Sequence, residues 1–559
     1  MRLTAAVFAL LTFVPVILAD EGTTTEEPWQ KTQNDVAIPM RDGKSLAANV
    51  LLPDKRGKYP CVLVQTPYNK DRMGREYGDD SKAGEAGRGS EKAWSLFDRE
   101  HYAYVFVDWR GFYGSKDAMQ GVNKRQWKRG QDGYDCVEWV AKQTWCDGKV
   151  GTWGGSALGK QQLDTLAEQP PHLVCAAPLI AYQGTRYEGY YEGGVMLDSH
   201  VKSLDRLGFG VGKFVTDNPL PDMRLWRFAR SLSYHPEKTQ VPCLLISGWW
   251  DNFPRDVIEQ YSDIIAKGTG KAKESKLVMG PWSHTAIDMA EQGDLKYAEA
   301  EDYSTKITIR FFDYYLRGME DSGWKDVPSV NAFQCGEDNW VTGDSWEKLV
   351  GKAKSMYLTA EGGIVDKPGT ATEDKPLTRQ YKYDPRNPTP TIGGQNLPPM
   401  THGPKDVSKI SKREDVLVYA TDKLPEPLAI RGEVELTVYF KCNRVDTDIH
   451  IRLCDEAGDG KQYLVSETIQ RATLRDGESV QELKPGETYS VTLRLAPHAY
   501  TWVKDHKLVL ILTGGNAPRY EPNTGDGSDH FDRAKALDVD VTIFHDAEHA
   551  AELTLPIVK

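Results

Sequence analysis

Two different hydrophobic patterns divide the chain. As far as about residue 320, short uninterrupted apolar runs alternate with stretches whose apolar residues recur every three or four positions. An uninterrupted apolar strand followed by a helix is typical of a parallel sheet that is covered on both faces. The runs that predict these strands are 61–65, 104–107, 150–153, 173–177, 241–247 and 277–280. The first part of the chain is therefore expected to be an α/β domain built on a mostly parallel sheet.

An antiparallel hairpin precedes these strands, because apolar residues alternate on both sides of the turn pair Asp42-Gly43. The interval 181–240 then interrupts the succession of strands and helices with Tyr, Gly and Pro and only a weak helical pattern. We expect this interval to be a cap inserted over the sheet. The insertion would divide the α/β domain into residues 20–180 and 241–324.

From about residue 325, strict alternation of apolar and polar residues replaces the helical pattern, as in 434–440, 489–495 and 537–543. Such alternation, with Gly, Asp and Pro in the turns, indicates half-buried antiparallel strands. We expect residues 325–559 to form an all-β sandwich or jelly roll. The polar, Pro- and Gly-rich stretch 366–403 is interpreted as a long excursion within this domain.

The charge balance and the first residues bear on partners and location. The chain has 81 Asp and Glu against 69 Lys and Arg, a net charge of -12, which argues against binding a polyanion such as nucleic acid. Residues 1–19 combine Arg2 with an apolar run that contains Pro15 and ends at Ala19, the layout of a secretory signal rather than of a membrane span. We expect a secreted or periplasmic protein that has no membrane attachment after cleavage.

The eight cysteines do not define a disulfide framework. Cys61, Cys175 and Cys243 lie in runs that predict buried strands, where a thiol behaves as a small apolar side chain, so we expect them to be free. Cys136 and Cys146 flank a helix end, and whether they form a disulfide stays open.

Cys442 and Cys454 are close in sequence. If the strands around 443–446 pair as a hairpin, however, Cys442 faces residue 448 and lies too far from Cys454 for a bond. No spacing of Cys and His predicts a metal site, and we expect no cofactor.

The motif that carries chemistry begins where strand 150–153 runs into Gly-Gly-Ser-Ala-Leu-Gly and then into a helix. A sharp, Gly-flanked turn centred on Ser between a strand and a helix is typical of a nucleophile elbow, which exposes the serine hydroxyl. The spacing G-x-S-x-x-G is one residue longer than the commonest form. Ser156 is the candidate nucleophile, and the N–H of Ala157 at the helix start is placed to donate to an oxyanion.

A serine nucleophile needs a base and an acid, which in this fold class follow in the order Ser, acid, His at the carboxyl ends of later strands. The two later apolar runs end in Gly-Trp-Trp-Asp and Gly-Pro-Trp-Ser-His, which places Asp251 and His284 at that edge. His200 and His235 fall in the insertion instead. Ser156, Asp251 and His284 are therefore predicted to form a catalytic triad.

Further motifs accompany these residues in order along the chain. They are T-P-Y (66–68), V-D-W-R-G (107–111), D-T-D (446–448), N-A-P-R-Y (516–520) and H-D-A-E-H (545–549). Together with the elbow and the two strand ends, they resemble the X-Pro dipeptidyl-peptidase and cocaine esterase (CocE/NonD) family of serine hydrolases. The likeness covers nearly all of the chain after the signal, and it implies an α/β-hydrolase fold with an inserted helical cap and a C-terminal jelly roll.

The resemblance also implies site residues that spacing alone does not give. The family's T-P-Y tyrosine donates to the oxyanion hole beside the N–H that follows the nucleophile, so Tyr68 joins Ala157 in that role. Phe253 resembles an aromatic wall of the acyl pocket, and Trp250 is assigned to substrate binding with it.

Asp108 and Arg110 recur in the family but look like a structural ion pair at a strand end, so we leave them out of the site.

The expected reaction is hydrolysis of a carboxylic ester or amide bond through an acyl-enzyme intermediate. Relatives that act on α-amino acid esters hold the substrate ammonium with carboxylates that follow the catalytic Asp, and here those positions hold Phe253 and Pro254. Glu188 and Glu192 in the cap remain as possible sources of negative charge.

We favour an esterase or acylase for uncharged acyl groups, acting on a small ester, amide or short peptide. An X-Pro dipeptidyl peptidase or α-amino acid ester hydrolase is the alternative. A catalytically silent extracellular glycan-binding protein is an alternative of another class.

Overall fold

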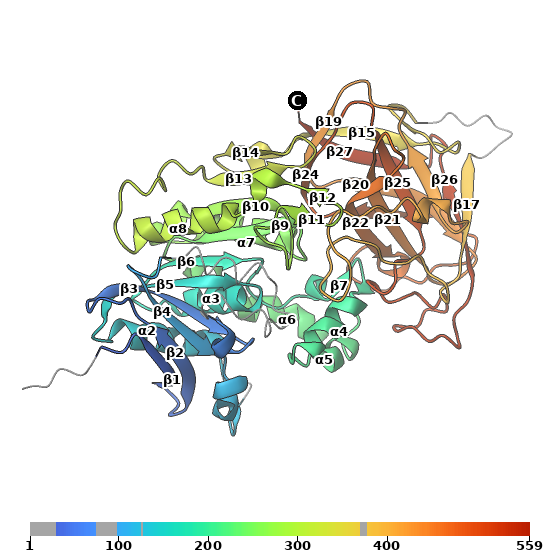
Figure 1. Ribbon diagram of the computed structural model, residues 1–559. Helices are drawn as coiled ribbons and strands as arrows, with labels where there is room; N and C mark the ends of the chain where they lie inside the picture. Colours follow the sequence, from blue (N-terminus) through green and yellow to red (C-terminus); the bar gives the residue numbers. More distant parts are fainter. Residues whose placement is uncertain (1–28, 74–97, 124–126, 369–376, 559) are drawn as a thin grey trace, which may run out of the picture.

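The computed structural model describes residues 29–73, 98–123, 127–368 and 377–558. The predicted signal, residues 1–19, lies outside these ranges. The described chain forms an α/β body followed by an all-β body (Figure 1). No helix in the described part of the chain has both the length and the apolar character needed to cross a membrane.

A ten-stranded sheet forms the centre of the α/β body, in the order β1-β2-β4-β3-β5-β6-β9-β10-β13-β14. Its strands are β1 (Thr32–Pro39), β2 (Ser45–Leu51), β3 (Tyr59–Thr66), β4 (Ala103–Asp108), β5 (Cys146–Gly155), β6 (Leu173–Leu179), β9 (Leu244–Trp250), β10 (Lys276–Ser283), β13 (Val330–Gln334) and β14 (Asn339–Gly343). From β4 to β13, each neighbouring pair is parallel. The predicted parallel sheet and its leading hairpin, β1 with β2, are confirmed.

Helices cover this sheet because the parallel strands are buried on both faces, as their unbroken apolar runs require. They are α2 (Arg129–Ala141), α3 (Ala157–Glu168), α7 (Pro254–Lys267) and α8 (Tyr303–Tyr315). Between β6 and β9, the chain leaves the sheet and forms the cap. Its elements are β7 (Tyr191–Glu192), β8 (Val195–Met196), α4 (Asp198–Arg206), α5 (Gly212–Thr216) and α6 (Arg224–Ser233), gathered around a small aromatic core of their own.

The all-β body is a sandwich of a nine-stranded and a four-stranded sheet. The larger sheet contains β15 (Lys352–Leu358), β16 (Ile364–Val365), β17 (Thr378–Tyr383), β19 (Leu428–Gly432), β20 (Glu435–Cys442), β23 (Tyr489–Arg494), β24 (His498–Trp502), β26 (Val539–Phe544) and β27 (Glu552–Val558). The smaller contains β18 (Leu417–Ala420), β21 (Asp448–Glu456), β22 (Gln462–Arg471) and β25 (Lys507–Thr513). Buried residues alternate strictly along β20, as the sequence predicts.

The structure confirms that Cys61, Cys175 and Cys243 are free and settles the question of Cys136 and Cys146. All eight are free and buried, including Cys136 and Cys146. Cys442 and Cys454 do not lie on a common hairpin, because β20 belongs to the larger sheet and β21 to the smaller one.

Two other details differ from the sequence analysis. Strands β13 and β14 follow residue 324 but continue the first sheet, since β13 pairs with β10. The domain boundaries themselves stay predictions. The expected ion pair of Asp108 and Arg110 is wrong: Asp108 accepts the N–H groups of Lys70 and Gly114, whereas the Arg110 guanidinium binds Asp132 and Asp42.

Candidate active site

Ser156 lies at a sharp turn between β5 and α3. Its φ of 57° and ψ of −121° are a strained combination for a residue with a side chain. The glycines around it allow this turn to pack closely. A Cβ on Gly159 would lie 2.5 Å from the Ala181 Cβ and 2.9 Å from the Leu179 carbonyl oxygen, so only glycine lets α3 approach the end of β6. The longer G-x-S-x-x-G spacing thus has a packing reason.

The three predicted triad residues lie together. Ser156 Oγ is 3.0 Å from His284 Nε2, and His284 Nδ1 is 2.6 Å from Asp251 Oδ1. Asp251 is fully buried, and its second oxygen accepts the Ser247 hydroxyl at 2.7 Å. This geometry follows from the fold, because β9 and β10 are parallel neighbours whose carboxyl ends share one edge of the sheet.

Two donor groups lie beside the Ser156 hydroxyl. Tyr68 follows β3, and its hydroxyl contacts both the Ser156 side chain and the backbone N–H of Ala157. Burial raises the pKa of Tyr68, although these two contacts lower it in part, so the hydroxyl stays protonated at neutral pH. Ala157 is the first residue of α3, where backbone N–H groups and the helix dipole favour negative charge.

An aromatic side chain forms the wall next to His284. The centre of the Phe253 ring lies 5.7 Å from the centre of the His284 ring and 5.3 Å from that of the Tyr182 ring, and both pairs are arranged edge to face. Phe253 also contacts His200 of the cap, at 6.0 Å between ring centres. Phe253 therefore lies beside His284, and its role as a wall of the acyl pocket stays a prediction.

Trp250 lies elsewhere. It is 1% exposed, and its Nε1 donates to the Leu464 carbonyl oxygen of the all-β body at 3.3 Å. Its ring packs on Tyr297 and His498. The assignment of Trp250 to substrate binding does not fit this position, because the side chain packs the two bodies together and presents no surface to a ligand. The sequence could not show this, since the partners come from distant segments.

The two cap carboxylates differ in their surroundings. Glu188 is exposed. Glu192 accepts the Tyr520 hydroxyl at 2.6 Å and the Arg519 guanidinium at 3.2 Å. A carboxylate that is already paired with a guanidinium is a poor site for a substrate ammonium, because its charge is neutralised.

Sequence reasoning missed two residues of this region. Ser247, in the middle of β9 and four residues before Asp251, could have been found as a polar residue in an otherwise apolar run. His200 belongs to the insertion, yet it is buried against Phe253 and its Nδ1 has no hydrogen-bond partner among the described residues. Burial, with His284, Arg519 and Lys160 nearby, lowers its pKa to about 3, so it is neutral at pH 7.

The described side chains include no group of three or more His, Cys, Asp or Glu arranged to hold a metal ion.

The class of α/β-hydrolase-fold serine hydrolases is defined by a mostly parallel sheet, a strained serine at its edge, and a histidine and an aspartate next to that serine. Residues 42–230 and 220–286 match the family model of the X-Pro dipeptidyl-peptidase (S15 family). Residues 322–554 match the model of the X-Pro dipeptidyl-peptidase C-terminal non-catalytic domain. The chain belongs to this family, which includes the CocE/NonD enzymes, and it is a serine hydrolase.

Individual relatives cover almost the whole chain. It is 26% identical to the cocaine esterase of Rhodococcus sp. (strain MB1 Bresler), over 94% of this chain and 98% of that protein. An aminopeptidase from a marine sediment thaumarchaeote has a TM-score of 0.79 at 20% identity, over 97% of this chain and 99% of the other. An α-amino acid ester hydrolase has a TM-score of 0.76 at 20% identity, over 97% and 100%. The two solved structures establish the fold.

Proposed function

We propose that this protein hydrolyses a carboxylic ester or amide bond through Ser156, His284 and Asp251, by way of an acyl-enzyme intermediate. The observation that carries the proposal is the continuous contact from Ser156 Oγ to His284 Nε2, 3.0 Å, and from His284 Nδ1 to Asp251, 2.6 Å. The first contact is the one that proton transfer from Ser156 to His284 requires, and the second orients the imidazole and stabilises its charged form.

In the proposed reaction, His284 Nε2 takes the hydroxyl proton while Ser156 Oγ attacks the carbonyl carbon. Asp251 accepts the Nδ1–H, orients the imidazole and stabilises the imidazolium that forms. His284 then gives its proton to the leaving alkoxide or amine, which departs and leaves the acyl group on Ser156. A water molecule, deprotonated by the same histidine, attacks the acyl-enzyme; the acid leaves as the bond to Ser156 Oγ breaks, and His284 returns the proton to Ser156.

The Tyr68 hydroxyl and the Ala157 N–H are proposed to stabilise the negative oxygen of both tetrahedral intermediates. Their support is their position beside the Ser156 hydroxyl and the raised pKa of Tyr68, which keeps a proton available for donation. Donors fixed before the reaction need no reorganisation when the charge develops.

For the substrate, we propose a small ester or amide with an uncharged acyl group. Phe253 presents an apolar ring beside His284, and Glu192 is engaged by Arg519. The name of the Rhodococcus relative, a cocaine esterase, supports ester hydrolysis.

We also propose export after removal of residues 1–19, which N-terminal sequencing of the mature protein would test.

A substrate panel tests this function. Aryl esters, aminoacyl esters and X-Pro p-nitroanilides would be compared on the purified protein, with aryl esters of uncharged acids expected to have the highest kcat/KM. Preference for a free α-amine would contradict the proposed substrate class and favour the dipeptidyl-peptidase or amino acid ester hydrolase alternative.

Ser156→Ala tests the chemistry itself. The variant should lose roughly a millionfold in kcat, because only oxyanion stabilisation and binding would remain. Activity within tenfold of the wild type would contradict the proposed nucleophile.

A further inference from the structure

A loop of the all-β body reaches the part of the α/β body that carries Asp251 and His284. It lies between β17 and β18 and is closed by two backbone hydrogen bonds between Gly394 and Gly403, both 2.9 Å long. We refer to residues 393–403 as the 393–403 loop. The sequence presents it only as the end of a polar excursion.

One side of the loop holds the segment around Asp251. Gln395 Nε2 donates to the carbonyl oxygen of Trp249 at 3.0 Å. Asn252 Nδ2 donates in turn to the carbonyl oxygen of Gln395 at 3.2 Å. Trp249, two residues before Asp251, and Asn252, the residue after it, are therefore both tied to Gln395 of the loop.

The other side holds the segment around His284. His402 Nδ1 lies 2.7 Å from Ser283 Oγ, and His402 Nε2 lies 3.4 Å from Thr285 Oγ1. These two residues precede and follow His284. Burial lowers the pKa of His402, with Lys405 and His284 adding to the effect, so the neutral ring can donate through one nitrogen and accept through the other.

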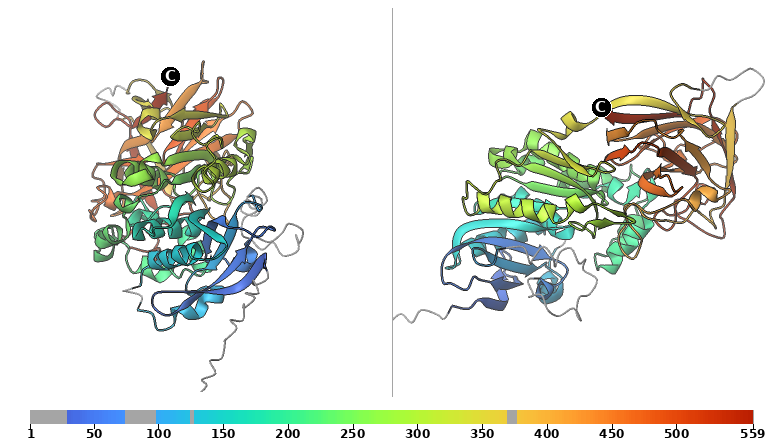
Figure 2. Two further views of the ribbon diagram at one scale, coloured as in Figure 1. Left: turned by 90° about the vertical axis from the view of Figure 1, so that its left-hand side faces the viewer. Right: turned by 45° about the horizontal axis from the view of Figure 1, so that its top comes forward.

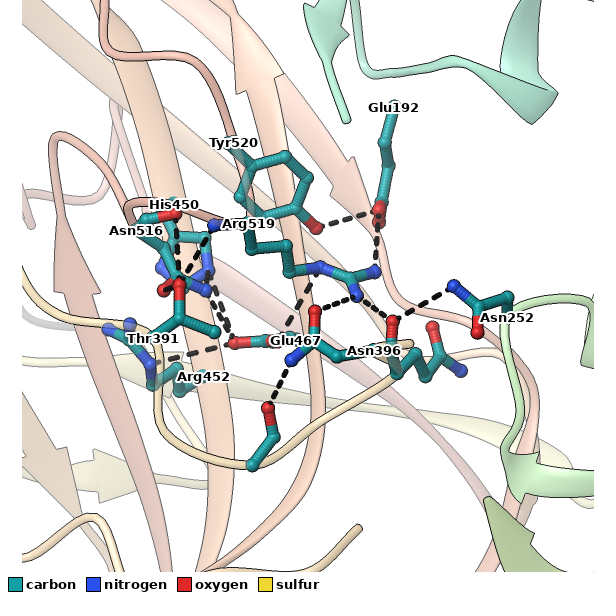
Figure 3. Close-up of polar contacts among 12 residues, drawn as sticks. Glu192, Asn252, Thr391, Asn396, His450, Arg452, Glu467, Asn516, Arg519 and Tyr520 are labelled. Atoms are coloured by element: carbon teal, nitrogen blue, oxygen red, sulfur yellow. Dashed lines mark hydrogen bonds and ion pairs between the residues drawn. The ribbon is translucent and has the colours of Figure 1, made fainter. Parts of the chain in front are cut away.

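Buried side chains fix the loop itself. The Arg519 guanidinium donates to the Gln395 carbonyl oxygen, to Asn396 Oδ1 and, at 3.2 Å, to Glu192 of the cap (Figure 3). Asn396 Nδ2 donates to the carbonyl oxygens of Gly393 and Thr401 across the loop. Arg519 and Asn396 are 4% and 2% exposed, so these bonds are shielded from competing water.

We propose that the 393–403 loop is a positioning element for the active site, in which Gln395 fixes the segment of Asp251 and His402 fixes the segment of His284. The inference rests on the proposed function of these two residues. Misplacement of a reacting group by about 1 Å can cost on the order of a hundredfold in rate, so contacts that hold both segments act on the chemical step. A part of the chain that matches a domain described as non-catalytic thereby contributes to catalysis.

The test compares His402→Ala with His402→Asn. The Ala variant should lower kcat, and the rate of Ser156 labelling by a fluorophosphonate, by about tenfold to a hundredfold, with KM within about twofold of the wild type. The Asn variant keeps an amide near the position of Nδ1. Its kcat and labelling rate should therefore lie much closer to those of the wild type than to those of the Ala variant. Gln395→Ala should lower kcat in the same way, because its bond to the Trp249 oxygen is lost.

A matched control separates positioning from stability. His506 is another half-buried histidine of the all-β body, 2.8 Å from Asp455 through its Nδ1. His506→Ala should leave kcat unchanged, even if thermal unfolding shifts. Labelling rates are divided by the concentration of folded protein, determined by titration. A partly unfolded variant therefore still gives a result.

The outcomes are distinguishable from a failure of the proposed function. If Ser156→Ala is inactive but His402→Ala and Gln395→Ala keep kcat within twofold of the wild type, the positioning role is wrong and the proposed function stands. Equal losses in His402→Ala, His402→Asn and His506→Ala would also overturn the positioning role, because they would reflect general destabilisation. If Ser156→Ala remains fully active, the proposed function itself fails.

Discussion

Tyr68 shows how much of the proposed chemistry depends on single atoms. Its ring packs against the core of the α/β body, whereas its hydroxyl contacts the Ser156 side chain and the Ala157 N–H. The two parts of the side chain therefore have separable roles, one in packing and one at the site. A substitution that removes only the oxygen tests the second role.

Tyr68→Phe should lower kcat by about 10²–10³, the usual cost of losing one oxyanion donor, with little change in ground-state binding. The apparent Tm should stay close to that of the wild type, because the ring is retained. Measuring kcat and thermal unfolding on the same preparations decides the question. A near-normal kcat for a small aryl ester, with chemistry rate-limiting, would remove Tyr68 from the oxyanion hole.

At the scale of elements, the nucleophile elbow depends on the close approach of α3 to β6. A Cβ on Gly159 would overlap both a side chain and a backbone oxygen, and the backbone at the end of a central strand cannot move aside cheaply. The helix start would have to shift, together with the Ala157 N–H.

Gly159→Ala should therefore destabilise the protein by about 1–3 kcal/mol, despite the higher helix propensity of alanine, and should also lower kcat. Chemical denaturation and kinetics would check this. Gly458→Ala is the matched control, because a Cβ there meets nothing within 4 Å. If both substitutions change the free energy of unfolding by the same amount, the packing explanation of the G-x-S-x-x-G spacing is wrong.

The elements whose patterns are local could be predicted from the sequence. The parallel strands, the cap insertion and the all-β body are confirmed, because an apolar run or a strict alternation reports burial directly. The meeting of Ser156, Asp251 and His284 was also predictable, since the carboxyl ends of parallel strands share an edge. Contacts between distant segments leave no such pattern. Arg110 has its acidic partners in other elements, and Trp250 is covered by the second body.

At the scale of the whole molecule, the cap is attached to the all-β body as well as to the sheet from which it emerges. The right-hand view of Figure 2 shows the two bodies side by side. Polar contacts join the cap to the second body. Glu192 binds Arg519 and Tyr520, and the Thr216 carbonyl oxygen lies 2.9 Å from His530 Nε2. Glu521 holds the other nitrogen of the same ring, at 3.2 Å.

This last contact predicts a pH dependence of stability. The hydrogen bond to Glu521 is the main cause that raises the pKa of His530 from 6.5 to about 9. The folded protein thus keeps a proton that the unfolded chain has lost, so the contribution is complete below about pH 6.5 and disappears as the pH rises through about 9. His530→Gln should lower the apparent Tm by one to two degrees near pH 6, roughly the effect of a partly exposed ion pair, and by less near pH 9.5. If His530→Gln lowers the Tm equally at both pH values, the protonated His530 does not contribute to stability through Glu521.

Covalent labelling shows whether Ser156 is an activated nucleophile, because only an activated serine reacts readily with a fluorophosphonate. The purified protein would be treated with a fluorophosphonate, measured by intact mass and then mapped by peptide analysis. We expect a single adduct on Ser156, no adduct in Ser156→Ala, and a strongly slowed reaction in His284→Ala, because the base is lost. Absence of an adduct on the folded wild-type protein, or an adduct that persists in Ser156→Ala, would contradict this expectation.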